Sequence, residues 1–132
     1  MSFWDWLINL LNYFKSPPRK PINLKVKLNM TTNTATLTWT NPTTRTDGSP
    51  LLPADISHVE IFDSSPTGDT SFGFGTSPFI TPVLNTGDHA FTVVVTDLAG
   101  KVSAPSNVAT VTVLPADVAP AAVTDLTAVL NA

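Results

Sequence analysis

The feature that most constrains the fold is the alternation of apolar and polar residues that begins near residue 22. Successive side chains on a strand point to opposite faces, so this alternation gives each segment one apolar face and one wet face. The segments that show it, or that carry a short apolar run, are 22–30, 34–40, 59–62, 79–84, 91–95 and 108–113. Turn-forming residues separate them, as at 41–50 and 97–100. Short strands joined by turns predict an all-β sandwich.

Two segments depart from the regular pattern. Pro82 interrupts residues 79–84, so we expect that strand at the edge of a sheet. Residues 64–78 are rich in Ser, Thr, Gly and Pro, and we expect them to be the least ordered stretch by composition.

Length and composition allow one domain with two tails. The chain has 132 residues, of which 42% are hydrophobic, enough for a packed core. It has no Cys, which excludes a disulfide framework and thiolate chemistry. We divide it into an N-terminal amphipathic helix with a Pro-rich basic neck (1–20), the sandwich (21–114), and a Pro/Ala linker with a C-terminal extended strand (115–132).

The net charge of −3 is unevenly distributed. Residues 1–27 hold five Lys or Arg and one Asp, which gives +4, and residues 28–132 hold two Lys or Arg and nine Asp or Glu, which gives −7. An acidic body argues against nucleic acid as a partner. The basic neck could still lie near an anionic surface.

Residues 2–15 have the pattern of a helix. Ser2 and Asp5 form a capping-box pattern, and Pro17-Pro18 end the helix. A narrow polar stripe leaves most of the surface apolar, and a helix this short is marginal alone in water. We therefore expect it to bind a partner through the following side chains: Phe3, Trp4, Trp6, Leu7, Leu10, Leu11 and Phe14.

The same segment differs from a secretory signal peptide. No positive charge precedes it, the basic residues follow it, and Asp5, Asn9 and Asn12 interrupt its apolar run. It is also shorter than the roughly 20 apolar residues that span a bilayer. We expect it to be retained in the mature protein.

Several motifs from residue 21 onwards occur in a familiar order: Pro21-x-x-Leu24, Leu37-x-Trp39 with Asn41-Pro42, Val59-Glu60-Ile61-Phe62, and the segment GDHAFTVVVTDLAGKVSAPSN at 87–107. Together they resemble a fibronectin type III domain, and residues 87–107 are similar to its bacterial and phage form. The resemblance covers about residues 21–114 and implies a sandwich used for spacing, adhesion or assembly. It implies that Trp39 is the core tryptophan and that Leu84 precedes the tyrosine corner, where this chain has His89 in place of tyrosine. An imidazole at that corner could donate a similar backbone hydrogen bond.

The C-terminal residues repeat the start of the sandwich. Residues 125–131 are identical to residues 23–29 at three of seven positions, and Asp125 stands opposite the similar Asn23, at an offset of 102 (125 minus 23). We expect this tail to be the first strand of a second repeat, and we expect Leu126 and Val129 to bind a partner.

Nothing in the sequence predicts catalysis or a cofactor. His58 and His89 are the only histidines, no nucleophile–base pair is apparent, and we predict no enzyme activity, no metal and no cofactor. An alternative reading places Asp63, Asp69 and Asp88 around a Ca²⁺ ion, although their spacing is not that of an EF-hand. The aromatic residues Phe62, Phe72 and Phe74 either form loop contacts with a ligand or pin a loop to the sandwich.

Three functions remain open. The first is a non-catalytic structural or interaction module of a larger assembly, present in many copies or as a homo-oligomer on the surface of a phage virion (capsid or tail), with the helix docked in a protein groove. The second is a module anchored at a membrane interface by the helix and its flanking cations. The third is an adhesion or carbohydrate-binding module at a bacterial cell surface.

Overall fold

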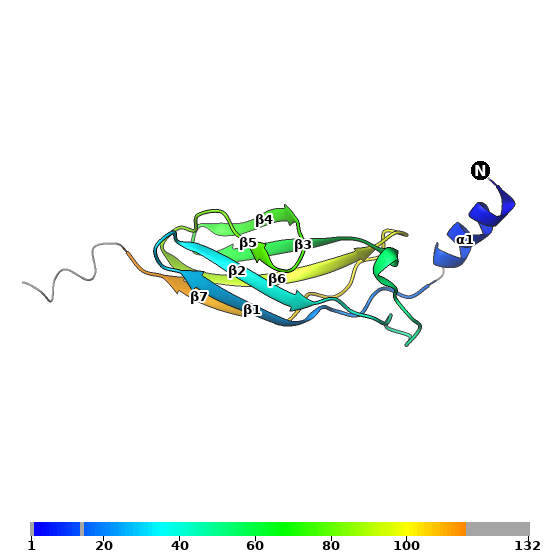
Figure 1. Ribbon diagram of the computed structural model, residues 1–132, viewed down its shortest axis with the longest axis horizontal. Coiled ribbons are helices and arrows are strands. Elements are labelled where there is room, and N and C mark those ends of the chain that lie inside the picture. The colour runs from blue at the N-terminus through cyan, green and yellow to red at the C-terminus, as the bar shows by residue number, and fades with distance from the viewer. Residues whose placement is uncertain (1, 14, 116–132) are drawn as a thin grey trace, which may run out of the picture.

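The computed structural model describes residues 2–13 and 15–115, and it shows a sandwich of two antiparallel sheets. One sheet has the order β1-β2-β5 and the other β4-β3-β6-β7 (Figure 1). The elements are α1 (Phe3–Tyr13), β1 (Ile22–Asn29), β2 (Thr34–Thr40), a 3-10 turn (Pro53–Asp55), β3 (Ile56–Ser65), β4 (Gly68–Phe74), β5 (Phe79–Ile80), β6 (Gly87–Asp97) and β7 (Ala109–Val113). The expected fold class is confirmed.

The strands overlap the alternating segments, but β5 covers only Phe79–Ile80 of the expected 79–84, and β4 was not expected. We expected residues 64–78 to be the least ordered stretch, and this was wrong because β4 occupies half of it and forms a hairpin with β3. Gly68 starts this strand with a φ of 118°, which suits glycine, and pairs with Ser65. The strand lies at an exposed sheet edge, so its polar residues did not produce a readable alternation.

The core lies between the inward faces of the two sheets. Its buried residues are Leu24, Ala35, Leu37, Trp39, Val59, Ile61, Leu84, Phe91, Val93, Val95, Ala109 and Val113. Trp39 is therefore a core residue, as the resemblance implied. The alternation also sets the outer face of the three-stranded sheet, which shows polar side chains such as Lys25 and Lys27 from β1 and Thr38 and Thr40 from β2.

The segment after β6 forms hydrogen bonds with the part of β6 that does not pair with β7. β7 pairs with residues 87–91 only. Further along, the Ser106 and Ser103 hydroxyls accept hydrogen bonds of 3.0 Å from the amides of Val93 and Val95. Asn107 then bridges to the other sheet, because its side chain accepts from the Leu24 amide at 2.9 Å and donates to the Leu24 carbonyl at 3.0 Å. The Ser-x-Pro-Ser-Asn run thus closes one side of the sandwich.

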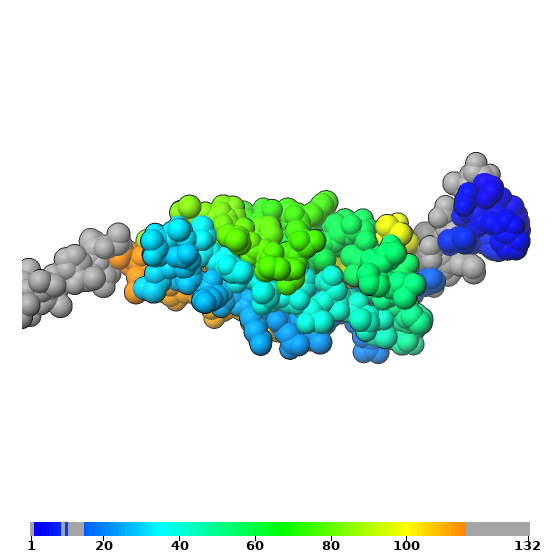
Figure 2. All heavy atoms as spheres, in the orientation of Figure 1, coloured from blue at the N-terminus to red at the C-terminus, as the bar shows by residue number. Residues whose placement is uncertain are grey.

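Helix α1 stands apart from the sandwich at one end of an elongated body, opposite the end where β7 finishes (Figure 1; Figure 2). Of the described helices, none is long and apolar enough to cross a membrane.

We predict that Phe91→Ala lowers the free energy of unfolding by about 3–5 kcal/mol, because Phe91 is fully buried and its loss leaves a cavity. Urea denaturation followed by tryptophan fluorescence measures this. Ile80→Ala, at an exposed position, is the control and should cost under about 0.5 kcal/mol. A similar cost for both variants would contradict the assigned core.

Candidate functional site

Apart from Asp5, the described side chains of α1 are apolar, and most are exposed. The predicted capping box is confirmed, since the Asp5 amide donates to the Ser2 hydroxyl at 3.1 Å and the Ser2 amide to the Asp5 carboxylate at 3.4 Å. Trp4 is 68% exposed and Phe3 64%, and their rings meet edge to face with centroids 5.7 Å apart. Further exposed apolar side chains are Trp6, Ile8 and Leu10. Exposed area of this kind on a short helix indicates a surface for association.

The other residues predicted to bind a partner are placed as follows. Leu7 is half-buried on α1. The side chain of Leu11 and the residues Phe14, Leu126 and Val129 lie outside the part of the chain that is described.

The neck, residues 15–20, is hydrogen-bonded along the loop 43–47 of the sandwich. The Arg19 amide donates to the Thr44 carbonyl at 3.1 Å, and the Thr46 amide donates to the Pro17 carbonyl at 2.9 Å. The Asp47 amide donates to the Ser16 hydroxyl at 3.1 Å. The neck is thus fixed to the body from Ser16 onwards.

A buried ion pair lies beneath the neck. The Arg45 guanidinium donates to the Asp97 carboxylate at 2.7 Å and to the Ser16 carbonyl at 3.0 Å, and both charged side chains are almost fully buried. The other oxygen of Asp97 accepts from the amides of Ala99 and Lys101 at 2.9 and 2.8 Å. A buried charge is tolerated only when it is paired and hydrogen-bonded. The pair therefore ties the neck to the end of β6.

Lys101 adds a second link, because its ammonium donates a hydrogen bond to the Lys15 carbonyl. Arg45 and Lys101 are the two cations in residues 28–132. Both contact the neck. Sequence reasoning missed these two residues as parts of the site, and the signal that could have found them was their isolation in an acidic body.

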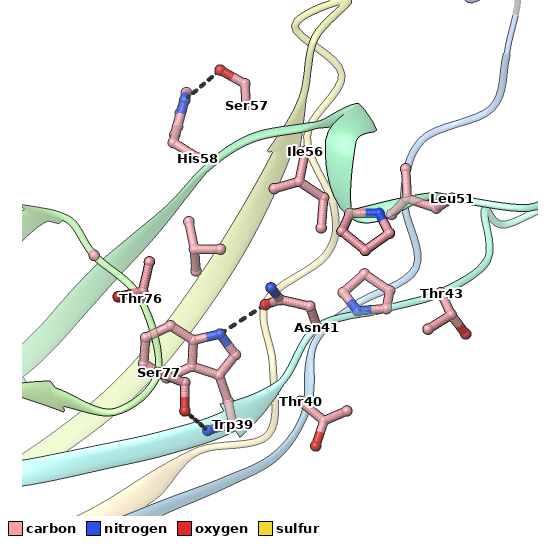
Figure 3. A pocket seen from close by; sticks show the side chains of 14 residues that line it. Trp39, Thr40, Asn41, Thr43, Leu51, Ile56, Ser57, His58, Thr76 and Ser77 are labelled. Carbon is pink, nitrogen blue, oxygen red and sulfur yellow. Dashed lines mark hydrogen bonds between the residues drawn. The ribbon is translucent and has the colours of Figure 1, made fainter.

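A hollow that we call the end pocket measures about 610 Å³ and lies between the end of β2 and the start of β3. Its lining includes Trp39, Asn41, Ile56, His58 and Ser77 (Figure 3). The Trp39 indole donates to the Asn41 side chain at 2.9 Å, and the Trp39 amide donates to the Ser77 hydroxyl at 3.0 Å. These polar groups bond to one another, and no carboxylate is among the lining residues.

His89 is buried and hydrogen-bonded at both ring nitrogens. Nε2 donates to the Asn85 carbonyl at 2.8 Å, and Nδ1 lies 2.7 Å from the Asp63 carboxylate. The predicted backbone bond at this corner is confirmed. Burial lowers the pKa of His89, but the bonds to Asn85 and Asp63 and the charges of Asp63 and Asp88 outweigh burial and raise that pKa above its ordinary 6.5. A carbonyl and a carboxylate both accept protons, so the geometry favours a protonated ring.

Solved structures with this architecture identify the fold. A fibronectin type III-like protein from Clostridium thermocellum matches with a TM-score of 0.54 and 20% identity, over 77% of this chain and 99% of that one. A human fibronectin type III domain from the KIAA0970 protein matches with a TM-score of 0.51 and 18% identity, over 89% and 86%. This chain has a fibronectin type III-like fold.

The titin domains A168–A170 also match, with a TM-score of 0.58 and 20% identity, over 75% of this chain. The fibronectin type III-like chain spans 33% of that titin fragment. No family model and no curated protein sequence matches this chain.

The three aromatic residues set aside for loop contacts lie on strands of the fibronectin type III-like sandwich. Phe72, on β4, packs against the core, with its ring 6.3 Å from that of Phe79. Phe74 is 64% exposed and stacks on His58 with ring centroids 3.9 Å apart. Phe62 is half-buried on β3 and lines a groove on the outer face of its sheet.

Two of the three aspartates considered for Ca²⁺, Asp63 and Asp88, have hydrogen-bond partners in this fold. Asp63 faces His89, and Asp88 accepts a hydrogen bond from the Thr112 hydroxyl at 2.6 Å. Within the described ranges, no three His, Asp or Glu side chains converge on one point. In the loop 43–51, hydrogen bonds from the Ser49 hydroxyl and amide, and then from Ser16, lower the pKa of Asp47 to about 2.

We predict that Arg45→Ala lowers the free energy of unfolding by about 3–5 kcal/mol, because it leaves Asp97 buried and unpaired. It should also speed amide hydrogen exchange at Arg19 and Thr46, whose amides join the neck to the loop. Lys27→Ala, which removes an exposed cation on β1 away from the neck, is the control. A cost below about 1 kcal/mol for Arg45→Ala would show that the pair does not hold the neck.

We predict that stability falls as pH rises above about 6.5. The folded state holds the His89 proton more tightly than the unfolded chain, so this contribution is complete below the ordinary pKa of 6.5 and is lost as pH rises through the raised pKa. Urea midpoints between pH 6 and 9 should show this slope in the wild type and in His58→Gln, but not in His89→Gln. Equal slopes in all three proteins would contradict the assignment.

Proposed function

We propose that this chain is a non-catalytic attachment module that docks into a groove of a partner protein through α1 and projects its sandwich outward. The observation that carries the proposal is the combination of an exposed aromatic helix and a neck fixed to the body by Arg45 and Lys101. A helix on a fixed base loses less orientational freedom on docking than one on a flexible linker. The arrangement therefore suits insertion into a groove.

The apolar side chains of α1 are the main source of binding free energy for this docking. Each large side chain contributes roughly 1.5–3 kcal/mol when it is fully buried. The exposed side chains of α1 together contribute on the order of 10 kcal/mol before the cost of association. Trp4 and Trp6 are suited as anchors because tryptophan is enriched among residues that dominate interface energies.

The assembly we propose is a phage virion, with the partner in the capsid or tail and this chain in many copies on the surface. Two observations support it. Residues 87–107 are similar to the bacterial and phage form of the fibronectin type III domain, and a small sandwich with a docking helix suits repeated attachment to a symmetric particle.

A protein groove is favoured over a membrane interface by the charges on α1. Helices that lie in a lipid interface carry Lys or Arg along their polar face. Over Phe3–Tyr13, α1 carries Asp5 as its charged residue, and the cations begin at Lys15 in the neck. A glycan site is less favoured, because Phe72 packs into the core and Phe74 is engaged with His58.

We predict that Trp4→Gln combined with Trp6→Gln reduces incorporation into particles at least tenfold, because it removes two aromatic anchors while keeping good helix formers. Copies per purified virion, counted by quantitative mass spectrometry, measure this. Ile80→Gln removes an equally exposed apolar side chain from the sandwich and should incorporate normally. Normal incorporation of the double variant would refute docking through α1, and flotation of the wild type with anionic liposomes would favour the membrane instead.

A further inference from the structure

The outer face of the four-stranded sheet carries an apolar groove that the core does not explain. Side chains on β3 and β6 alternate, so Phe62, Ala90, Thr92 and Val94 point away from the buried Ile61, Phe91 and Val93. With Pro105 and Val108 they line a hollow of about 380 Å³, which we call the outer groove. The water-facing side of an antiparallel sheet is normally polar.

The other sheet shows what an ordinary outer face looks like in this chain. There β1 and β2 present Lys25, Lys27, Thr38 and Thr40 to solvent. The outer groove differs in having Phe62 and Val94 half-buried on its floor and Val108 exposed at 59% on its wall. Apolar side chains gathered on one face, when the opposite face is polar, indicate an interaction surface.

Charge separates the outer groove from the neck. Strands β3, β4, β6 and β7, all within the described ranges, contain no Lys or Arg. Glu60, Asp69 and Asp88 lie on the three strands around the groove, and Asp69 is among its lining residues. The cations Lys15, Arg19 and Lys20 lie instead in the neck, beside α1.

We propose that the outer groove receives α1 from a second copy of this chain, so that copies associate head to tail. An apolar helix with a basic base complements an apolar groove with an acidic rim, both in the kind of surface and in the sign of charge. The groove lies along the first half of β6, whereas the neck is tied to Asp97 at the end of that strand. Because helix and groove are different surfaces, the contact is heterologous and propagates into chains or rings.

This inference rests on the proposed function, since it uses the same helix. It identifies the outer groove of a second copy as a binding site for α1, which would place copies of the chain beside one another. It also requires that α1 can leave one site for the other or that different copies use it differently. The test must therefore separate loss of the helix from loss of the groove.

The experiment measures the mass of the full chain against concentration by light scattering after size exclusion. The wild type should form concentration-dependent oligomers. Trp4→Gln combined with Trp6→Gln should weaken association at least tenfold, and so should Val94→Lys combined with Val108→Lys. Val83→Lys combined with Val102→Lys places the same charges at exposed valines outside the groove and should associate like the wild type. Urea denaturation of each variant confirms that it folds.

The decisive test is to mix the helix variant with the groove variant. The helix variant keeps an intact groove and the groove variant keeps an intact helix, so together they should form a 1:1 heterodimer that grows no further. Raised salt should weaken it, because exposed charges are screened. A monomeric wild type overturns the inference, as does association that survives the groove substitutions or a mixture that forms no heterodimer. Any of these results leaves the proposed function standing, which falls only if the helix variant is incorporated into particles normally.

Discussion

The structure depends on how β6 places titratable residues at both ends of a buried strand face. Its inward side chains, in order, are His89, Phe91, Val93, Val95 and Asp97. The alternation that buries the three apolar residues also turns the two end residues inward, where a charge is costly unless it is paired. Each end residue has a partner: His89 pairs with Asp63 on β3, and Asp97 pairs with Arg45 in the loop after β2.

These two pairs have different consequences. At the His89 end, both ring nitrogens are bonded within the sandwich, and the pair replaces the corner that a tyrosine hydroxyl makes in the family it resembles. At the Asp97 end, the Arg45 guanidinium also donates a hydrogen bond to the Ser16 carbonyl. The buried pair thereby also holds the neck, residues 15–20, against the body.

Much of the fold could be predicted from the sequence, because period-two patterns are local. The segments around Leu24, Leu37 and Val93 were assigned to strands from alternation alone, and α1 from its spacing and its cap. The edge strand β4 could not be predicted, since its exposed polar residues leave no alternation. For the candidate site, the apolar residues of α1 were visible in the sequence, whereas the roles of Arg45, Asp97 and Lys101 were not, because their partners are at least 29 residues away in the chain.

The sequence by itself determined the sandwich class, the amphipathic helix and the uneven distribution of charge, because each follows from neighbours along the chain. Only the tertiary structure decided that the neck lies fixed along the loop 43–47 and that Phe72 faces inward while Phe62 faces outward into a groove. Those outcomes depend on strand register and on the pairing of distant residues. A shift of one residue would exchange the two faces, so the outer groove exists only once the sheets have paired in this register.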